Sequence, residues 1–123
     1  MLMQAIANDG IMLKPYLINK LTSADGRIVY EGRTEVLSEA TSKQTADKVT
    51  EALVSAARYG SSHHTGLGDT AELFNKYQVA GKTGTAENGN EKDTVNAWFI
   101  SFAPANNPQY VVAVNQCNTN KGG

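Results

Sequence analysis

The residues best suited to chemistry in this chain form one short stretch, Val79-Ala-Gly-Lys-Thr-Gly-Thr-Ala86. Gly-Lys-Thr also ends the P-loop that binds nucleotide phosphates, but a P-loop needs another glycine five positions before Gly81, where this chain has Lys76. The residues after a P-loop open a helix, whereas Gly84 and Gly89 would interrupt one here. The sequence therefore argues against nucleotide binding.

The same stretch has the properties of a peptide-binding edge strand. In a strand, alternate side chains point to opposite faces, so Thr83 and Thr85 share one face while Lys82 and Gly84 share the other. An extended peptide can pair with the backbone of an edge strand, and a glycine permits its close approach. Two hydroxyl groups on one face can hold a carboxylate. Taken alone, however, this pattern is more typical of a plain exposed strand than of a site.

Three segments, taken together, make the chain resemble the C-terminal part of the transpeptidase domain of class B penicillin-binding proteins. They are Ala5–Gly10 followed by Lys14-Pro-Tyr16, then Val79–Glu87, then Ala97–Pro104, in the order of the family. The resemblance runs through residues 1–123 and implies an α+β fold, part of an αβα sandwich in which helices pack on an antiparallel sheet. It also implies that residues 1–123 are an incomplete domain, without the upstream nucleophile region and the last helix.

The resemblance implies a serine D,D-transpeptidase that binds penicillin and cross-links peptidoglycan stem peptides through an acyl-serine intermediate. Lys82 and Thr85 would be catalytic, because Lys82 supplies positive potential at a proton-relay serine and the Thr85 N–H stabilises the oxyanion. Thr83, Gly84 and Thr85 would bind substrate, with both hydroxyls on the terminal carboxylate of D-Ala-D-Ala or of a β-lactam. No metal and no organic cofactor are implied.

Two motifs of the family are missing from the sequence. The nucleophile lies in Ser-x-x-Lys, yet no serine here has a lysine three positions on, and Ser55 comes closest with Arg58. Ser-x-Asn is also absent, and the chain reaches Lys121-Gly-Gly123 about where the family continues into a helix. We therefore expect the chain to be inactive alone. The parent would be a bacterial enzyme on the outer face of the cytoplasmic membrane, anchored by a segment outside these residues.

Two other functions remain open at this point. A serine β-lactamase shares the fold and the Lys-Thr-Gly element, although Thr85 and Ala86 after that element, together with Ala97–Pro104, favour the transpeptidase. A non-catalytic β-lactam sensor or a scaffold domain of the division machinery would only bind. The upstream sequence would discriminate, since an enzyme needs the Ser-x-x-Lys nucleophile.

Composition excludes further classes of function. The 11 basic residues nearly cancel the 12 acidic ones, which argues against a nucleic-acid or polybasic membrane surface. Cys117 is the single cysteine, so neither an internal disulfide nor a thiolate zinc cage can form. His63 and His64 are adjacent and without ligands at metal-binding spacing, which favours a solvated loop. The longest apolar run, Ala97–Ala103, is far shorter than the ~20 residues of a membrane helix.

Periodicity and turn residues predict the elements around this strand. We expect a short helix that ends at Asn8-Asp9-Gly10. Ile11–Leu37 should form a hairpin, with strands at residues 16–22 and 27–31 about an Asp25-Gly26 turn. A longer helix should run from a capping box at Thr41-Ser-Lys-Gln44 to Tyr59. Its buried face is expected to carry the four apolar residues Ala46, Val49, Leu53 and Ala56.

Three strands are predicted after the loop that follows this helix: Gln78–Glu87, Ala97–Ala103 and Gln109–Cys117. The last two carry apolar side chains on both faces of the strand, which predicts that other elements cover both faces. Trp98 is then expected in the core, and Cys117 as a packing residue. An incomplete domain would leave some of that surface open. We therefore expect the chain to self-associate.

Overall fold

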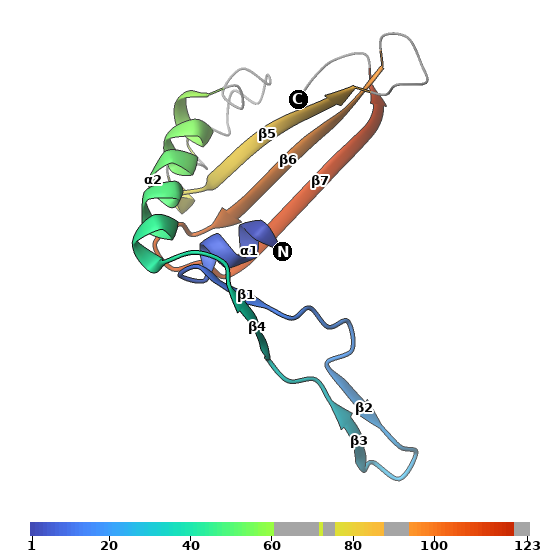
Figure 1. Cartoon of the computed structure of the whole chain (residues 1–123). Coiled ribbons are helices and arrows are strands. Elements are labelled where there is room, and N and C mark those ends of the chain that lie inside the picture. The colour runs from blue at the N-terminus through green and yellow to red at the C-terminus, as the bar shows by residue number, and fades with distance from the viewer. Residues whose placement is uncertain (61–71, 73–75, 88–93, 120–123) are drawn as a thin grey trace.

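The structure, a computed structural model, describes residues 1–60, 72, 76–87 and 94–119. A body of helices and strands carries a thin two-stranded arm (Figure 1). The helices are α1 (Leu2–Ala7) and α2 (Lys43–Tyr59). The strands are β1 (Ile11–Leu13), β2 (Lys20–Thr22), β3 (Ile28–Glu31), β4 (Val36–Glu39), β5 (Ala80–Glu87), β6 (Val95–Ala103) and β7 (Tyr110–Thr119). Helices combined with antiparallel strands are the predicted α+β class.

The sheet of the body is an antiparallel meander in the order β5-β6-β7. Thr83 lies opposite Phe99, and Phe99 lies opposite Val114. The three strands predicted from sequence are confirmed with shifted ends. The first begins at Ala80 because Gln78 has a left-handed φ of 47°, which interrupts extended backbone. Within the sheet, β5 is an edge strand.

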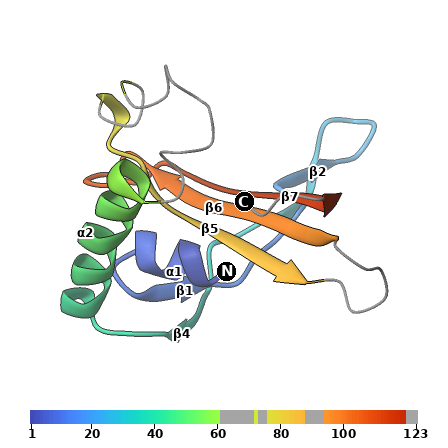
Figure 2. The ribbon, with the colours of Figure 1, turned by 90° about the horizontal axis from the view of Figure 1, so that it is seen from above.

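Both helices pack on one face of this sheet, at the end where β5 begins (Figure 2). Met3 of α1, Ala80 of β5 and Phe102 of β6 form the buried core, with Leu53 of α2 packed against them. The described residues thus supply one helix layer, as expected of a part of an αβα sandwich.

Much of the sheet is uncovered in the described residues, as expected of an incomplete domain. The side chains of β7 are exposed from Tyr110 to Asn118, including that of Cys117. Trp98 on the central strand keeps 40% of its surface exposed instead of lying in the core. Apolar side chains on both faces of these strands indicate that both faces pack against other elements, but α1 and α2 reach only part of one face.

The boundaries of α2 confirm the predicted helix and correct its cap. Ser42 is the N-cap, because its Oγ accepts a hydrogen bond from the Thr45 N–H at 3.3 Å, so the capping box does not start at Thr41. The helix ends at Tyr59 as predicted. On its inner face Ala46 and Ala57 are buried, whereas the predicted Ala56 is only half-buried.

A backbone hydrogen bond and an ion pair connect the end of α1 to the start of α2. Gly10 has a left-handed φ of 88°, as the predicted C-terminal turn requires, and its carbonyl accepts the Ala40 N–H at 2.9 Å. Lys43 Nζ contacts carboxylate oxygens of Asp9 at 2.7 Å and of Asp47 at 2.9 Å. These hydrogen bonds, that with Asp9 first, hold the pKa of Lys43 above its ordinary value of 10.5.

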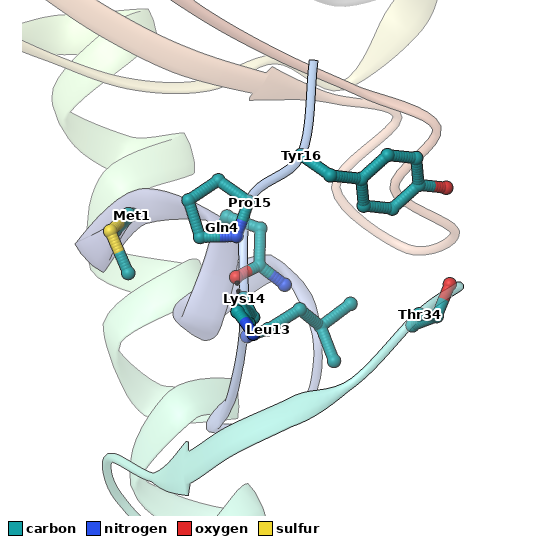
Figure 3. A pocket seen from close by; sticks show the side chains of 7 residues that line it. All are labelled: Met1, Gln4, Leu13, Lys14, Pro15, Tyr16 and Thr34. Atoms are coloured by element: carbon teal, nitrogen blue, oxygen red, sulfur yellow. Dashed lines mark hydrogen bonds between the residues drawn. The ribbon is translucent and has the colours of Figure 1, made fainter. Parts of the chain in front are cut away.

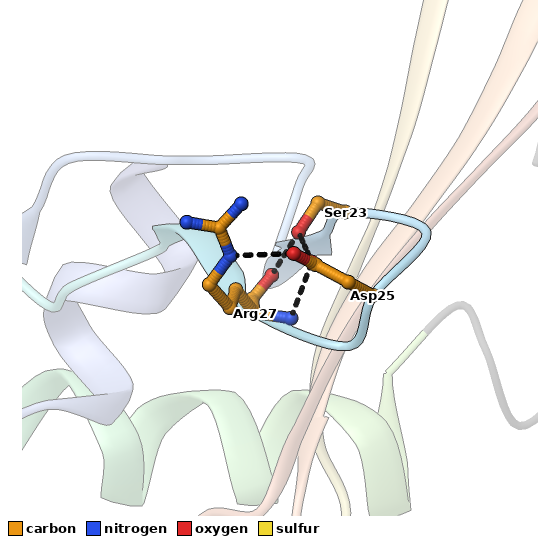
Figure 4. Close-up of polar contacts among 3 residues, drawn as sticks. All are labelled: Ser23, Asp25 and Arg27. Atoms are coloured by element: carbon orange, nitrogen blue, oxygen red, sulfur yellow. Dashed lines mark hydrogen bonds and ion pairs between the residues drawn. The ribbon is translucent and has the colours of Figure 1, made fainter.

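The arm consists of two short antiparallel pairs, β1 with β4 at its base and β2 with β3 toward its tip. The predicted turn at Asp25-Gly26 is confirmed, with Gly26 at a φ of 84°. The Asp25 carboxylate accepts hydrogen bonds from the Ser23 hydroxyl and from the backbone and Nε of Arg27 (Figure 4). The first predicted strand, residues 16–22, shortens to β2, and the β1–β4 pair was not predicted.

Candidate functional site

The Lys-Thr-Gly-Thr stretch lies in the middle of β5, where the strand leaves the core. Ala80 and Gly81 are buried, Thr83 and Gly84 are half-buried, and Lys82 and Thr85 are exposed. The buried beginning of the strand anchors it under α2, and the part with the polar groups lies open beyond the helices. A strand fixed at one end and accessible further along is suited to present its residues to a ligand.

Register and pleat distribute these residues over two faces. Lys82 and Gly84 lie opposite Ile100 and Trp98 on the face that the helices partly cover. Thr83 and Thr85 lie opposite Phe99 and Ala97 on the other face. The alternation expected from sequence is thus realised, and the roles assigned to the four residues remain predictions.

The Lys82 ammonium is close to the threonine face, although its side chain starts from the opposite face. Its Nζ donates to the Thr83 carbonyl oxygen at 2.8 Å and lies 3.4 Å from the Thr83 hydroxyl. Because β6 occupies one side of β5, the lysine side chain must turn round the outer edge, the edge facing away from β6. A positive charge and a hydroxyl group thereby meet at this edge, an arrangement that suits a carboxylate.

Packing within the chain requires a glycine at position 81 but not at position 84. A Cβ atom at Gly81 would lie 2.8 Å from the Phe99 ring, so the packing of this chain requires a glycine there. A Cβ at Gly84 would meet only the Trp98 Cβ, at an ordinary 3.6 Å. Packing among the described residues therefore does not demand a glycine at 84, and a glycine there permits close approach of another backbone.

The other candidate groups from the sequence, His63 and His64, are outside the described residues. Among the residues that are described, no three metal-ligating side chains cluster, and no helix is long and apolar enough to span a membrane. A cavity of 380 Å³ lies at the base of the arm (Figure 3). It is lined by Met1, Gln4, Leu13, Lys14, Pro15, Tyr16 and Thr34.

Sequence reasoning placed Trp98 in the core, on a strand expected from the resemblance to lie beside the candidate strand, and did not identify it as the direct neighbour of Gly84. Its position opposite Gly84 follows from the β5–β6 register. That register depends on the connection between the two strands, which composition alone does not define. The one available signal was the high polarity of residues 88–93, which are typical of a turn.

Comparison with known proteins assigns this geometry to a family. Residues 1–123 match the family described as the penicillin-binding protein transpeptidase domain. The chain belongs to this family. The resemblance inferred from the three sequence segments is thereby confirmed.

Curated relatives are about one-third identical to this chain over the residues that align. It is 36% identical to the peptidoglycan D,D-transpeptidase PbpA of Mycolicibacterium smegmatis over 111 residues, which are 89% of this chain and 21% of that protein. It is also 36% identical to the penicillin-binding protein PbpB of Mycobacterium tuberculosis over 118 residues, 90% of this chain and 17% of that protein. The chain thus spans about a fifth of the length of these relatives.

Solved structures of transpeptidase domains share the fold. The crystal structure of PBPA from Mycobacterium tuberculosis superposes with a TM-score of 0.76 at 35% identity, over 92% of this chain and 26% of that one. The penicillin G acyl-enzyme complex of the same protein gives 0.76 at 34% identity, over 98% of this chain and 25% of that one. These matches confirm the predicted fold class.

Proposed function

We propose that this chain is the C-terminal portion of a transpeptidase domain and supplies the substrate-binding strand of a peptidoglycan D,D-transpeptidase. The observation that carries the proposal is the position of Lys82 and Thr83 at the outer edge of β5, where an ammonium and a hydroxyl meet. The family match over residues 1–123 supports it. The sequence holds no Ser-x-x-Lys, so the serine nucleophile would come from another part of the complete enzyme.

In the proposed reaction, a D-Ala-D-Ala stem peptide or a β-lactam pairs with the outer edge of β5 as an added strand. The hydroxyls of Thr83 and Thr85 donate to its terminal carboxylate, and the Thr85 N–H donates to the developing oxyanion. The serine attacks the D-Ala-D-Ala amide carbon and D-Ala leaves with the proton on its amine. An amine of a neighbouring stem peptide then attacks the acyl-serine, which restores the hydroxyl. Lys82 supplies positive potential for these proton transfers.

The proposed enzyme acts at the outer face of the bacterial cytoplasmic membrane, where peptidoglycan is assembled. A membrane anchor would belong to a segment other than the 123 residues of this chain. Its partners are stem peptides and β-lactam antibiotics, with no nucleic acid, and the reaction needs no metal and no organic cofactor. The relatives named as peptidoglycan D,D-transpeptidases support this assignment.

A chimera tests the proposal. The segment of the M. smegmatis PbpA that matches this chain is replaced by residues 1–123, and labelling by a fluorescent penicillin is measured after SDS electrophoresis. We expect the chimera to be labelled and the chain alone to stay unlabelled, because only the chimera contains the serine. A folded chimera without label would contradict the proposed strand function. An SDS-stable adduct on the chain alone would contradict the assignment of the nucleophile to another segment.

A further inference from the structure

Glu87 continues the row of the two threonines on β5. Thr83, Thr85 and Glu87 occupy alternate positions, so their side chains share the face of the strand opposite the helices. Glu87 is exposed, and no ion pair between described residues involves it. At roughly 3.4 Å per residue, the row ends in a carboxylate about 7 Å beyond Thr85.

The burial of β5 decides in which direction a ligand strand can extend from the threonines. Ala80 and Gly81 are buried at the start of the strand, whereas its other end is exposed and leads away from both helices (Figure 2). Gly81 has no side chain, so the buried part is the backbone itself. A ligand whose terminal carboxylate lies at Thr83 and Thr85 therefore has to extend toward Glu87. It runs antiparallel to β5.

In this orientation Glu87 faces the part of the ligand on the acyl side of the reacting carbonyl. Directly opposite residues of an antiparallel pair have Cβ atoms about 4.5–5.5 Å apart, which is within reach of a carboxylate. The Lys82 ammonium binds the Thr83 carbonyl, about 14 Å back along the strand. Because the Debye length is about 8 Å at physiological ionic strength, that positive charge does not cancel the negative charge of Glu87.

We infer that Glu87 is a specificity-determining residue of the proposed site, which favours a cationic group on the acyl side of the reacting carbonyl and disfavours an anionic one. This inference rests on the proposed function, because that function places the ligand carboxylate at Thr83 and Thr85. A ligand amine opposite Glu87 gains a charge pair, whereas a ligand carboxylate is repelled. The favoured ligands are acyl-D-Ala-D-Ala peptides and β-lactams with a free amine in the acyl side chain.

The test uses three penicillins that share one scaffold and differ in the charge of the acyl side chain. This side chain is neutral in penicillin G, carries an amine in ampicillin and carries a carboxylate in carbenicillin. The second-order acylation rate of each compound is measured in the PbpA chimera that contains residues 1–123. Dividing the ampicillin rate by the carbenicillin rate gives a charge preference, and penicillin G is the neutral reference for each chimera.

Glu87→Gln isolates the contribution of the charge, because the amide keeps the size of the side chain. We expect the charge preference to fall about tenfold in this variant, since both an attraction and a repulsion are lost. Salt at about 1 M, where the Debye length is about 3 Å, should reduce the preference of the unmodified chimera toward that of the variant. Glu51→Gln, which removes an exposed carboxylate from α2, is the matched control and should leave the preference unchanged.

Two results would overturn the inference, and they differ in what else they overturn. An equal charge preference in the unmodified and Glu87→Gln chimeras, both acylated by penicillin G, would refute the role of Glu87 and leave the proposed function intact. No acylation of a folded chimera by any of the three penicillins would refute the proposed function of β5, and the role of Glu87 with it.

Discussion

At the scale of single residues, the hydroxyls of Thr83 and Thr85 are the groups that the proposed function uses most directly. They share the face of β5 opposite the helices, and the Lys82 ammonium lies 3.4 Å from the first of them. Replacing both threonines by valine keeps the shape of the side chains and removes the hydrogen-bond donors. Each lost charge-assisted hydrogen bond costs about 1.5–3 kcal/mol, or roughly tenfold to a hundredfold in rate.

The measurement is the second-order rate of penicillin acylation in the PbpA chimera. We expect the double valine variant to be slow but active, because the Thr85 N–H is retained. Lys82→Ala should be slower still, since it removes positive charge from both the carboxylate and the proton transfers. If the double valine variant reacts at the unmodified rate, β5 does not hold the carboxylate.

At the scale of elements, a few polar groups stabilise the turn at the tip of the arm, where the residues of β2 and β3 are exposed. The Asp25 carboxylate is hydrogen-bonded first by the Ser23 hydroxyl and then by Arg27, and these bonds hold its pKa below the ordinary value of 3.8. A lowered pKa in the folded state stabilises the turn above the pKa of the unfolded chain. This contribution is lost as pH falls below 3.8 through the folded pKa.

We therefore expect acid to loosen the arm tip before it affects the body. In NMR spectra, the Arg27 amide resonance should shift as the pH is lowered below 3.8, while resonances of the core residue Phe102 stay in place. Asp25→Asn, which removes the charge, should abolish this titration. An Asp25 carboxyl that titrates above 3.8 would contradict the assigned hydrogen bonds.

Elements that depend on neighbouring residues could be predicted from the sequence, whereas those that depend on pairing between distant residues could not. The Asp25-Gly26 turn and the end of α2 at Tyr59 follow from neighbouring residues, and both were predicted. The β1–β4 pair joins two short segments separated by the whole arm, and neither has a pattern that identifies its partner. At the site, alternation along β5 was predictable from period two alone. The pairing of Gly84 with Trp98 was not, because it depends on register across residues 88–93.

At the scale of the whole molecule, the sheet ends in a strand that is unusual for an edge. Natural edge strands are protected by charges, prolines or cover, whereas β7 contains none of the charged residues or prolines of the chain. Its exposed apolar side chains are Tyr110, Val111, Val112 and Val114. Such a strand can pair with another copy of itself or bury its face against one.

We expect the chain alone to self-associate, as was predicted from sequence. Multi-angle light scattering should give a mass above the 13.2 kDa of one chain. Substituting Val112 and Val114 by lysine, both already about half exposed, should shift the mass toward the monomer. Val29→Lys on the arm is the matched control and should have no effect. A clean monomer of the unmodified chain at high concentration would show that β7 does not pair.

The pairing of Met3 with Phe102 in one core has a consequence for how the chain folds during synthesis. The β5-β6-β7 meander joins consecutive segments, and such local contacts form early because little loop entropy is lost. Met3 and Ile6 leave the ribosome before the sheet does, and their site on the sheet exists only once β6 has been made. Helix α1 thus emerges before its partner strand and keeps its apolar side uncovered until β6 has been translated.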